Sequence, residues 1–320
     1  MPDFKRIVLT TDLSPDADCA TPYAVEFARS FGGSIDLLHA FEDLRYIEGA
    51  MPDVAAAVRL DWLQEARIDQ EARLVQRAAS INRTTGVGVH PVQLDGNSAE
   101  VVVYYARREN ADCIVMATHG RSGFSHFMFG SVAERVLQRS SCPVLTVKPK
   151  QDKKKGVGQF KTIVMATDFS ANSDAARPYA LAMAKRYGST LHVIHVFENE
   201  IMFAQTGAEH ASRFEELMQT ERAWREERLK NYARELGAED RGVIHTLGRG
   251  QPASKIASYA SAVDADCIVI ATHGRTGLSH LLIGSVAERI VRLAVCPVLC
   301  VKPETVVAGK SESLPAKSAV

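Results

Sequence analysis

Two loops of this chain combine glycine, serine and arginine at a spacing that suits a phosphate group. The first loop reads Ala117-Thr-His-Gly120, then nine residues, then Gly130-Ser131. Gly120 has no Cβ and tolerates positive φ, so the backbone can approach a ligand closely. Gly130-Ser131 opens a helical pattern, where unpaired N–H groups and the helix dipole favour anions, and the serine can also cap the helix. Arg121 could reach the same phosphate.

The same chemistry occurs a second time in the chain. The second loop has matching residues at Gly274, Arg275, Gly284 and Ser285. Thr11-Asp12 and Thr167-Asp168 each follow the first apolar run of a half, and an aspartate there could accept a ribose hydroxyl or hold Mg²⁺. A helix cap and a turn residue are the plainer interpretations of a lone Gly-Ser and a lone Asp. The loops nevertheless kept their pattern while the segments between them diverged, which indicates a constraint on the loops.

Both loops belong to a long internal repeat. Residues 112–149 and 266–303 are related by a constant offset of 154, and 25 of the 38 positions are identical. A unit of about 150 residues is far longer than a solenoid repeat, so it indicates a duplicated domain. We expect domains at 1–149 and 160–303. A lysine-rich solvated linker is expected at 150–159, and a loose tail at 304–320.

The elements that must position these loops alternate between apolar runs and helical patterns. In the first half we expect strands at Arg6–Thr10, Ser34–Ala40, Gly88–Gln93, Cys113–Ala117 and Val144–Lys148, and helices near 17–31, 58–82, 99–109 and 132–139. The second half repeats this order, with a solvated, ion-paired helix near Ala211–Leu236. Strands that are apolar throughout, separated by helices, predict two fused flavodoxin-like α/β units, each with a doubly wound, five-stranded parallel sheet. Such sheets bind ligands outside the carboxyl ends of their strands, so the loops after strands one and four form the predicted site.

Composition excludes several classes of protein. The chain balances 38 Lys and Arg against 38 Asp and Glu, which argues against nucleic acid as the main partner. No apolar run approaches the roughly 18 residues that a membrane span needs, and no secretory signal is evident. Six cysteines without a CxxC pair indicate reduced, largely buried thiols and a cytoplasmic location. His119 and His273 lack a second histidine at metal spacing, and we expect His39 and His195 to be packed and not catalytic.

Both halves of the chain resemble universal stress proteins. The family's nucleotide signature, G-2x-G-9x-G-[S/T], matches from its second glycine onward in both loops, whereas alanine replaces its first glycine at Ala117 and Ala271. Because alanine is the smallest replacement, this departure weakens the implied site without removing it. The T-D-x-S start and the closing C-P-V-L-x-V-K-P of each half are also similar to the family pattern. The resemblance covers about residues 4–149 and 160–303.

The resemblance implies ATP as the ligand, and Asp12 and Asp168 are the residues placed to hold a Mg²⁺ ion that accompanies it. It places adenosine contacts at Thr11, Asp12, Ala40, Met116 and Ala117, and at Thr167, Asp168, Val196, Ile270 and Ala271. It places phosphate contacts at His119, Gly120, Gly130, Ser131 and Val132, and at His273, Gly274, Gly284, Ser285 and Val286. It also implies that the fifth strands, Pro143–Lys148 and Pro297–Lys302, pair antiparallel as an internal pseudo-dimer, with a homodimer as a further assembly.

The function implied by the resemblance is that of a cytoplasmic, nucleotide-dependent stress sensor or regulator, with no catalytic residue assigned. Two alternatives remain open. One is a slow Mg-dependent ATPase, and the other is a nucleotide-free interaction scaffold of the same family. We also expect the two halves to differ, because Asp95 of the first half would repel a triphosphate where Arg249 of the second would attract it.

Overall fold

A computed structural model describes residues 2–42, 55–118, 130–149, 158–198, 208–237, 243–274 and 283–303, without the side chains of 55–61 and 208–214. The elements of the first half are β1 (Arg6–Thr10), a 3-10 turn (Ala17–Ala20), α1 (Thr21–Phe31), β2 (Ser34–Phe41), α2 (Ala55–Thr85), β3 (Val89–Asp95), α3 (Ser98–Arg108), β4 (Cys113–Ala117), α4 (Ser131–Arg139) and β5 (Val144–Val147). Those of the second half are β6 (Thr162–Ala166), α5 (Ala171–Asp174), α6 (Arg177–Tyr187), β7 (Thr190–Phe197), α7 (Ala208–Glu235), β8 (Val243–Arg249), α9 (Pro252–Ala262), β9 (Cys267–Ala271), α10 (Ser285–Leu293) and β10 (Val298–Val301).

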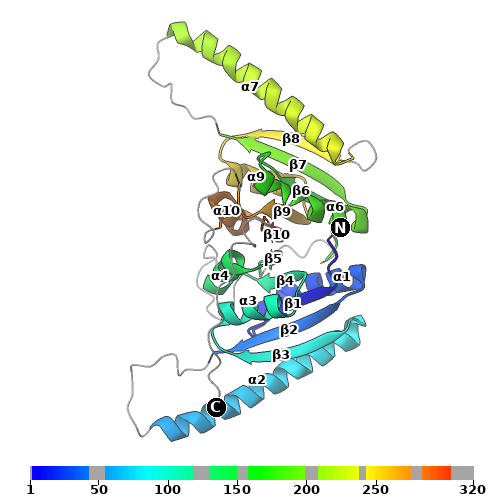
Figure 1. Ribbon diagram of the computed structural model, residues 1–320, viewed down its shortest axis with the longest axis vertical. Helices are drawn as coiled ribbons and strands as arrows, with labels where there is room; N and C mark the ends of the chain where they lie inside the picture. Colours follow the sequence, from blue (N-terminus) through cyan, green and yellow to red (C-terminus); the bar gives the residue numbers. More distant parts are fainter. Residues whose placement is uncertain are drawn as a thin grey trace.

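The ten strands lie in one sheet in the order β3-β2-β1-β4-β5-β10-β9-β6-β7-β8 (Figure 1). Pairing within each half is parallel, as in Ile7 with Ile35 of β2 and with Cys113 of β4. Strand order reverses between β1 and β4, and again between β6 and β9. Residues of α1, α2, α6 and α7 pack on one face, and residues of α3, α4, α9 and α10 on the other. The prediction of two fused, doubly wound flavodoxin-like units is confirmed.

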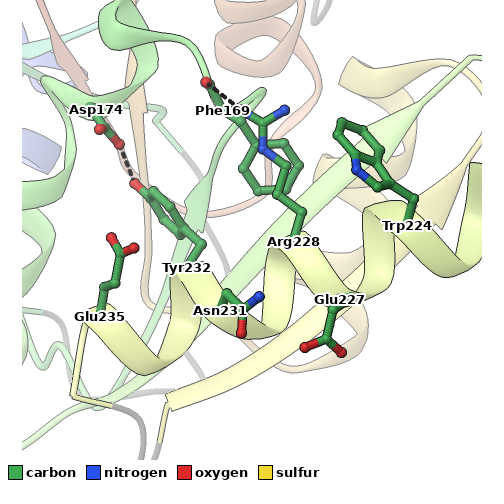
Figure 2. A pocket seen from close by; sticks show the side chains of 8 residues that line it. All are labelled: Phe169, Asp174, Trp224, Glu227, Arg228, Asn231, Tyr232 and Glu235. Carbon is green, nitrogen blue, oxygen red and sulfur yellow. Dashed lines mark hydrogen bonds between the residues drawn. The ribbon is translucent and has the colours of Figure 1, made fainter.

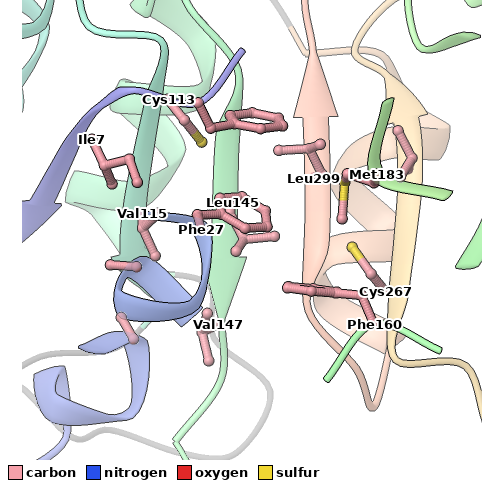
Figure 3. Packing of buried hydrophobic residues seen from close by; sticks show 14 of the residues in the cluster. Ile7, Phe27, Cys113, Val115, Leu145, Val147, Phe160, Met183, Cys267 and Leu299 are labelled. Atoms are coloured by element: carbon pink, nitrogen blue, oxygen red, sulfur yellow. The ribbon is translucent and has the colours of Figure 1, made fainter. Parts of the chain in front are cut away.

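The two halves join through their fifth strands. β5 and β10 pair antiparallel, with Leu145 opposite Leu299, as the sequence resemblance implied. The buried cluster on the α1 face continues across this junction, where Figure 3 shows Leu145 and Phe27 of the first half facing Leu299 and Phe160 of the second. The ring centroids of Phe27 and Phe160 lie 5.2 Å apart. The junction is therefore continuous in both hydrogen bonding and apolar packing.

The helix expected at 17–31 is in fact broken into a 3-10 turn and α1. Pro22 lies at the start of α1, and a proline there removes the N–H that a continuous helix would need. The second half breaks at the matching point, between α5 and α6, where Pro178 starts α6. Helix α1 ends at Gly32, which adopts the left-handed conformation with φ of 68°.

The expectation that all strands are apolar throughout is wrong for β3 and β8. Both lie at the outer edges of the sheet and carry several exposed or half-buried residues. The long helices α2 and α7 pack against these edge strands and end the molecule on either side (Figure 1). Arg225 pairs with Glu221 on α7, in keeping with an ion-paired helix.

The cysteines fit the expectation of reduced, largely buried thiols. All six are free, and Cys113, Cys267, Cys296 and Cys300 are buried, whereas Cys19 and Cys142 are partly exposed. Within the part of the chain that the structure describes, we find no helix with the length and hydropathy of a membrane span.

Candidate functional site

The loop after the first strand of each half has an unusual, repeated backbone. Leu13 and Phe169 have φ of 63° and 62°, in the left-handed region that bulky residues seldom adopt. The threonine two residues earlier stabilises the bend, because Thr11 Oγ1 accepts from the Leu13 N–H and Thr167 Oγ1 from the Phe169 N–H, each at 3.0 Å. The T-D-x-S pattern thus specifies a turn that holds the aspartate at the carboxyl end of the central strand.

The aspartate side chains of these loops are oriented by the following serine. Asp12 Oδ1 accepts from the Ser14 N–H at 2.9 Å. Asp168 Oδ1 accepts from both the N–H of Ser170, at 2.9 Å, and its hydroxyl, at 2.6 Å. Both carboxylates are half-buried. One oxygen of each is used to fix the side chain.

In the second half, the loops after the first and fourth strands touch each other. A Cβ added to Gly274 would lie 2.6 Å from Asp168 Oδ2, so no other residue fits there without moving the carboxylate. Asn172 Nδ2 donates to the Gly274 carbonyl at 3.1 Å and fixes the approach. The glycine of the sequence pattern is therefore required by close contact with the aspartate. Asn172 was not anticipated from sequence, although it stands four residues after Asp168.

The start of the fourth helix is tied to the end of the fourth strand in both halves. The Gly284 N–H donates to the Thr272 carbonyl at 2.7 Å, and the Gly130 N–H donates to the Thr118 carbonyl at 3.0 Å. A Cβ added to Gly284 would lie 2.8 Å from that Thr272 oxygen. The tie holds the first turn of the helix against the strand end.

Serine does not cap these helices, contrary to one expectation. Gly130 and Gly284 are the N-cap residues of α4 and α10, and neither has a side-chain capping bond. Ser131 and Ser285 are the first helical residues, and both are exposed. Without a side-chain cap, the amide groups of the first turn are left for water or an anion.

The residues assigned to adenosine lie at the carboxyl ends of their strands, but several of their side chains point into the core. Met116, Val196 and Ile270 are buried in the cluster that α3, α4, α9 and α10 cover. Ala40 and Val286 pack against that same cluster, whereas Ala117 is half-buried and Ala271 is buried in the cluster on the opposite face. Val132 is 36% exposed at the start of α4. These positions therefore divide between the two faces of the sheet and the exposed start of α4.

His39 and His195 are packed, as expected, and they support the first-strand loops from beneath. His195 Nδ1 contacts the Thr167 carbonyl at 2.8 Å, and Arg225 donates to its Nε2 at 3.1 Å. His39 makes the same contact to the Thr11 carbonyl at 2.9 Å, with Gln70 in place of Arg225. Gln70 and Arg225 were not predicted, because they lie on α2 and α7, whose sequences diverged. Their separation of 155 positions, close to the offset of the repeat, is the signal that could have found them.

Some predicted site residues lie outside the described residues, namely His119, Gly120, Arg121 and Arg275. Of their neighbours, His273 is buried, and its Nδ1 lies 3.0 Å from Thr272 Oγ1. A search of the described residues finds no cluster of three or more His, Cys, Asp or Glu side chains that could hold a metal ion.

Comparison with known proteins identifies the family. The model of the universal stress protein family matches residues 3–148 and again residues 159–302. The chain belongs to the universal stress protein family. A universal stress protein of Methanocaldococcus jannaschii is 35% identical over 152 residues, which are 47% of this chain and 85% of that protein. One of Mycolicibacterium smegmatis is 26% identical over 299 residues, 93% of this chain and 97% of its own length.

The solved structures agree with this tandem universal stress protein architecture. The crystal structure of a universal stress protein from Archaeoglobus fulgidus superposes with a TM-score of 0.67 at 23% identity. It covers 94% of this chain, and 98% of that chain is matched. This likeness extends over both halves and their junction, and it concerns the fold alone.

Proposed function

We propose that this universal stress protein binds an adenine nucleotide, ATP, at the strand ends of both halves. The observation that carries the proposal is the pair of close approaches at Gly274 and Gly284, where an added Cβ would lie 2.6 and 2.8 Å from neighbouring atoms. Glycine at these points lets the loop after β9 approach Asp168 and lets the start of α10 approach the end of β9, so the two loops meet at one edge of the sheet. The uncapped first turn of α10 adds N–H groups and a positive dipole end on the same side, which suit phosphate.

The residues present also fit a magnesium ion that arrives with the nucleotide. Mg²⁺ in nucleotide sites is commonly held by one or two carboxylates, with phosphate oxygens and water completing the shell. Asp12 and Asp168 each provide one such carboxylate at the end of the central strand. The ion would neutralise part of the phosphate charge beside the aspartate, and Asp168 Oδ1 is already held by Ser170.

We further propose that the protein acts as a regulator in the cytoplasm. Its two halves would work together as an internal dimer. Family membership supports a part in the stress response. Two similar nucleotide sites joined by one sheet would let occupancy of one half be felt by the other through β5 and β10.

The proposal is tested by measuring how much ATP the purified chain binds. Equilibrium dialysis with Mg-ATP should give two sites per chain, at micromolar strength or weaker. Ser285→Ala removes only an exposed hydroxyl and should weaken the second-half site several-fold without lowering the melting temperature. Gly284→Val should remove that site and leave one, since its side chain would displace the helix start. Gly88→Ala, at an uncrowded glycine, serves as the control. Absence of uptake at millimolar ATP would refute the proposal.

Slow hydrolysis is the second candidate, because Asp168 lies beside Gly274 at the strand ends, where a carboxylate could hold the Mg²⁺ ion of Mg-ATP. Phosphate release from Mg-ATP is measured for the unaltered chain, for Asp168→Ala and for Asp12→Ala. Turnover that is lost in these variants while ATP still binds would assign an ATPase. Equal background rates in all three leave ATP binding without turnover.

A further inference from the structure

A pocket of about 440 Å³ lies between α7 and the segment that follows β6 in the second half (Figure 2). Two neighbouring rows of α7 side chains form one wall. Trp224, Arg228 and Tyr232 make up the first row, and Glu227, Asn231 and Glu235 make up the second. Within each row the residues are four positions apart and therefore lie on one face of the helix. Phe169 and Asp174 face them from the opposite side.

The first row of α7 side chains and Phe169 hold one another in place. The Arg228 guanidinium lies 4.7 Å from the ring centroid of Phe169 and 5.3 Å from that of Trp224. It also donates to the Phe169 carbonyl at 3.4 Å. The Tyr232 ring meets Phe169 edge-on, with centroids 5.9 Å apart. Trp224 remains 55% exposed, so part of its indole surface is open to a ligand.

The side chains that line the pocket carry more negative than positive charge. Asp174, Glu227 and Glu235 line the pocket with Arg228, and Arg177 lies beside it, so three carboxylates against two guanidinium groups leave a formal charge of −1. Tyr232 donates its hydroxyl to Asp174 at 2.6 Å, which satisfies one oxygen without neutralising the charge. Arg177 pairs with Glu235 at 3.3 Å. Glu227 has no ion pair or hydrogen bond to any side chain that the structure describes.

The first half lacks this combination at the matching positions. Arg77 stands where the second half has Tyr232, and it pairs with Asp18, the counterpart of Asp174. Arg77 also donates to Thr11 Oγ1 at 3.3 Å. Asp69 and Ala72 replace Trp224 and Glu227. Where the first half has an ion pair, the second half thus has aromatic rings beside Asp174 and Glu227, neither of which forms an ion pair with a described residue.

We propose that this pocket binds a small organic cation, in which a protonated amidine, guanidine or amine is attached to a flat apolar group. The cationic end would meet Glu227 and the neighbouring carboxylates, and the flat group would cover the open face of Trp224. Carboxylates bind such cations through charge-assisted hydrogen bonds, and aromatic faces attract them as well. None of its lining residues belongs to the glycine loops, and its nearest link to the proposed nucleotide site is Phe169, which follows Asp168 in the loop after β6.

The probe is benzamidine, a flat cation, compared with neutral benzamide and anionic benzoate of similar shape. In Trp62→Phe, Trp224 is the only tryptophan, so its fluorescence reports the pocket directly. We expect saturable quenching by benzamidine, and binding of benzamide and benzoate that is at least about tenfold weaker. Raising the salt concentration should weaken benzamidine binding, because charges at an open pocket are screened.

Two variants and one control test whether benzamidine binding depends on the charge and the aromatic residues of the pocket. Glu227→Gln keeps the shape of the pocket and should weaken benzamidine binding about five- to tenfold, the range of one charge-assisted contact at a partly exposed site. Tyr232→Arg brings in the first-half residue and should abolish binding. Glu226→Gln alters an exposed neighbour outside the pocket and should change nothing. The proposal is overturned if quenching does not saturate below about 10 mM, if benzoate binds as well as benzamidine, or if Glu227→Gln and Glu226→Gln behave alike while both remain folded.

Discussion

Lys148, just after β5 in the first half, donates its ammonium to the carbonyl of Arg292 in the last turn of α10, in the second half, at 2.5 Å. The same ammonium reaches the Ala294 carbonyl at 2.8 Å. Lys302 makes the reciprocal contact, from the end of β10 to the Gln138 carbonyl of α4, at 2.7 Å. Each half thus supplies a cation to the negative end of a helix in the other.

This exchange of lysines predicts the effect of removing one of them. Lys148→Met keeps the length of the side chain but leaves two helix-end carbonyls without a donor. We expect a loss of about 1–2 kcal/mol in unfolding free energy, the usual value of such charged hydrogen bonds at helix ends. Urea unfolding measures it, with Lys230→Met on the exposed face of α7 as the control. Equal midpoints for the two variants would show that the contacts contribute nothing.

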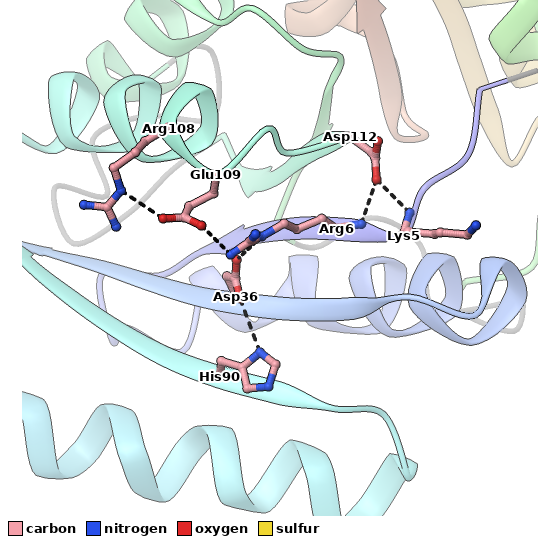
Figure 4. Close-up of polar contacts among 7 residues, drawn as sticks. All are labelled: Lys5, Arg6, Asp36, His90, Arg108, Glu109 and Asp112. Atoms are coloured by element: carbon pink, nitrogen blue, oxygen red, sulfur yellow. Dashed lines mark hydrogen bonds and ion pairs between the residues drawn. The ribbon is translucent and has the colours of Figure 1, made fainter.

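A second prediction concerns a charge cluster of the first half (Figure 4). Asp36 is buried, with 3% of its surface exposed, and accepts from Arg6 Nε at 3.0 Å. His90 Nδ1 lies 3.4 Å from the same carboxylate. The Asp36 carboxylate raises the pKa of Arg6, chiefly through this hydrogen bond.

Asp36→Ala should therefore destabilise the chain by about 2–3 kcal/mol, because it leaves the guanidinium without its buried partner. Asp95→Ala, which removes an exposed pair with Arg67, should cost less than about 1 kcal/mol. Chemical unfolding of the two variants side by side makes the comparison. A smaller loss for Asp36→Ala than for Asp95→Ala would contradict it.

Alkaline pH should destabilise the protein through its buried thiols. Burial raises the pKa of Cys300 to about 12 from 9.0. A thiol that stays protonated when folded contributes stability that is complete below pH 9 and is lost as the pH rises toward 12. Each such thiol adds a slope of about 1.4 kcal/mol per pH unit in that window.

Unfolding free energy, measured in reductant from pH 8 to 11, should fall less steeply in Cys300→Ala than in the unaltered chain. Val301→Ala is the control, since it removes neighbouring buried volume without removing a thiol. It should lower stability at every pH and leave the slope unchanged. Parallel curves for Cys300→Ala and the unaltered chain would disprove the assignment.

Two glycines near β2 and β3 should respond differently to the same change. A Cβ added to Gly33 would lie 2.2 Å from the Lys5 carbonyl oxygen, whereas one added to Gly88 finds its nearest neighbour at 3.9 Å. Gly33→Ala should lower unfolding free energy by about 3 kcal/mol, since the backbone must shift. Gly88→Ala should change it by less than about 1 kcal/mol. Thermal unfolding distinguishes them, and similar melting temperatures would be the opposing result.

The fold was largely predictable because the repeat and the apolar strands determine it. The pattern located β1 and β4 to the residue, and the resemblance supplied the pairing of β5 with β10. The edge position of β3 and β8 was not visible, since strand order depends on tertiary packing. The break before α1 follows from Pro22, whose missing N–H outweighs the continuous helical period of residues 17–31.

The candidate site was predictable where a residue type is forced by its backbone, as at Gly274 and Gly284. The supporting contacts of Asn172 and Arg225 were not, because they join elements far apart in the sequence. The expected contrast between Asp95 and Arg249 also stays a prediction. Asp95 forms an ion pair with Arg67 at 2.9 Å, which offsets part of the repulsion expected toward a phosphate.

The pairing of β5 with β10 also determines how this protein responds to dilution. Association between separate chains follows mass action and weakens as the protein becomes scarce. Here each fifth strand carries its complement in the same polypeptide, so the two meet at an effective concentration that the amount of protein in the cell does not change. The pairing of the two halves through β5 and β10 therefore does not depend on the protein concentration.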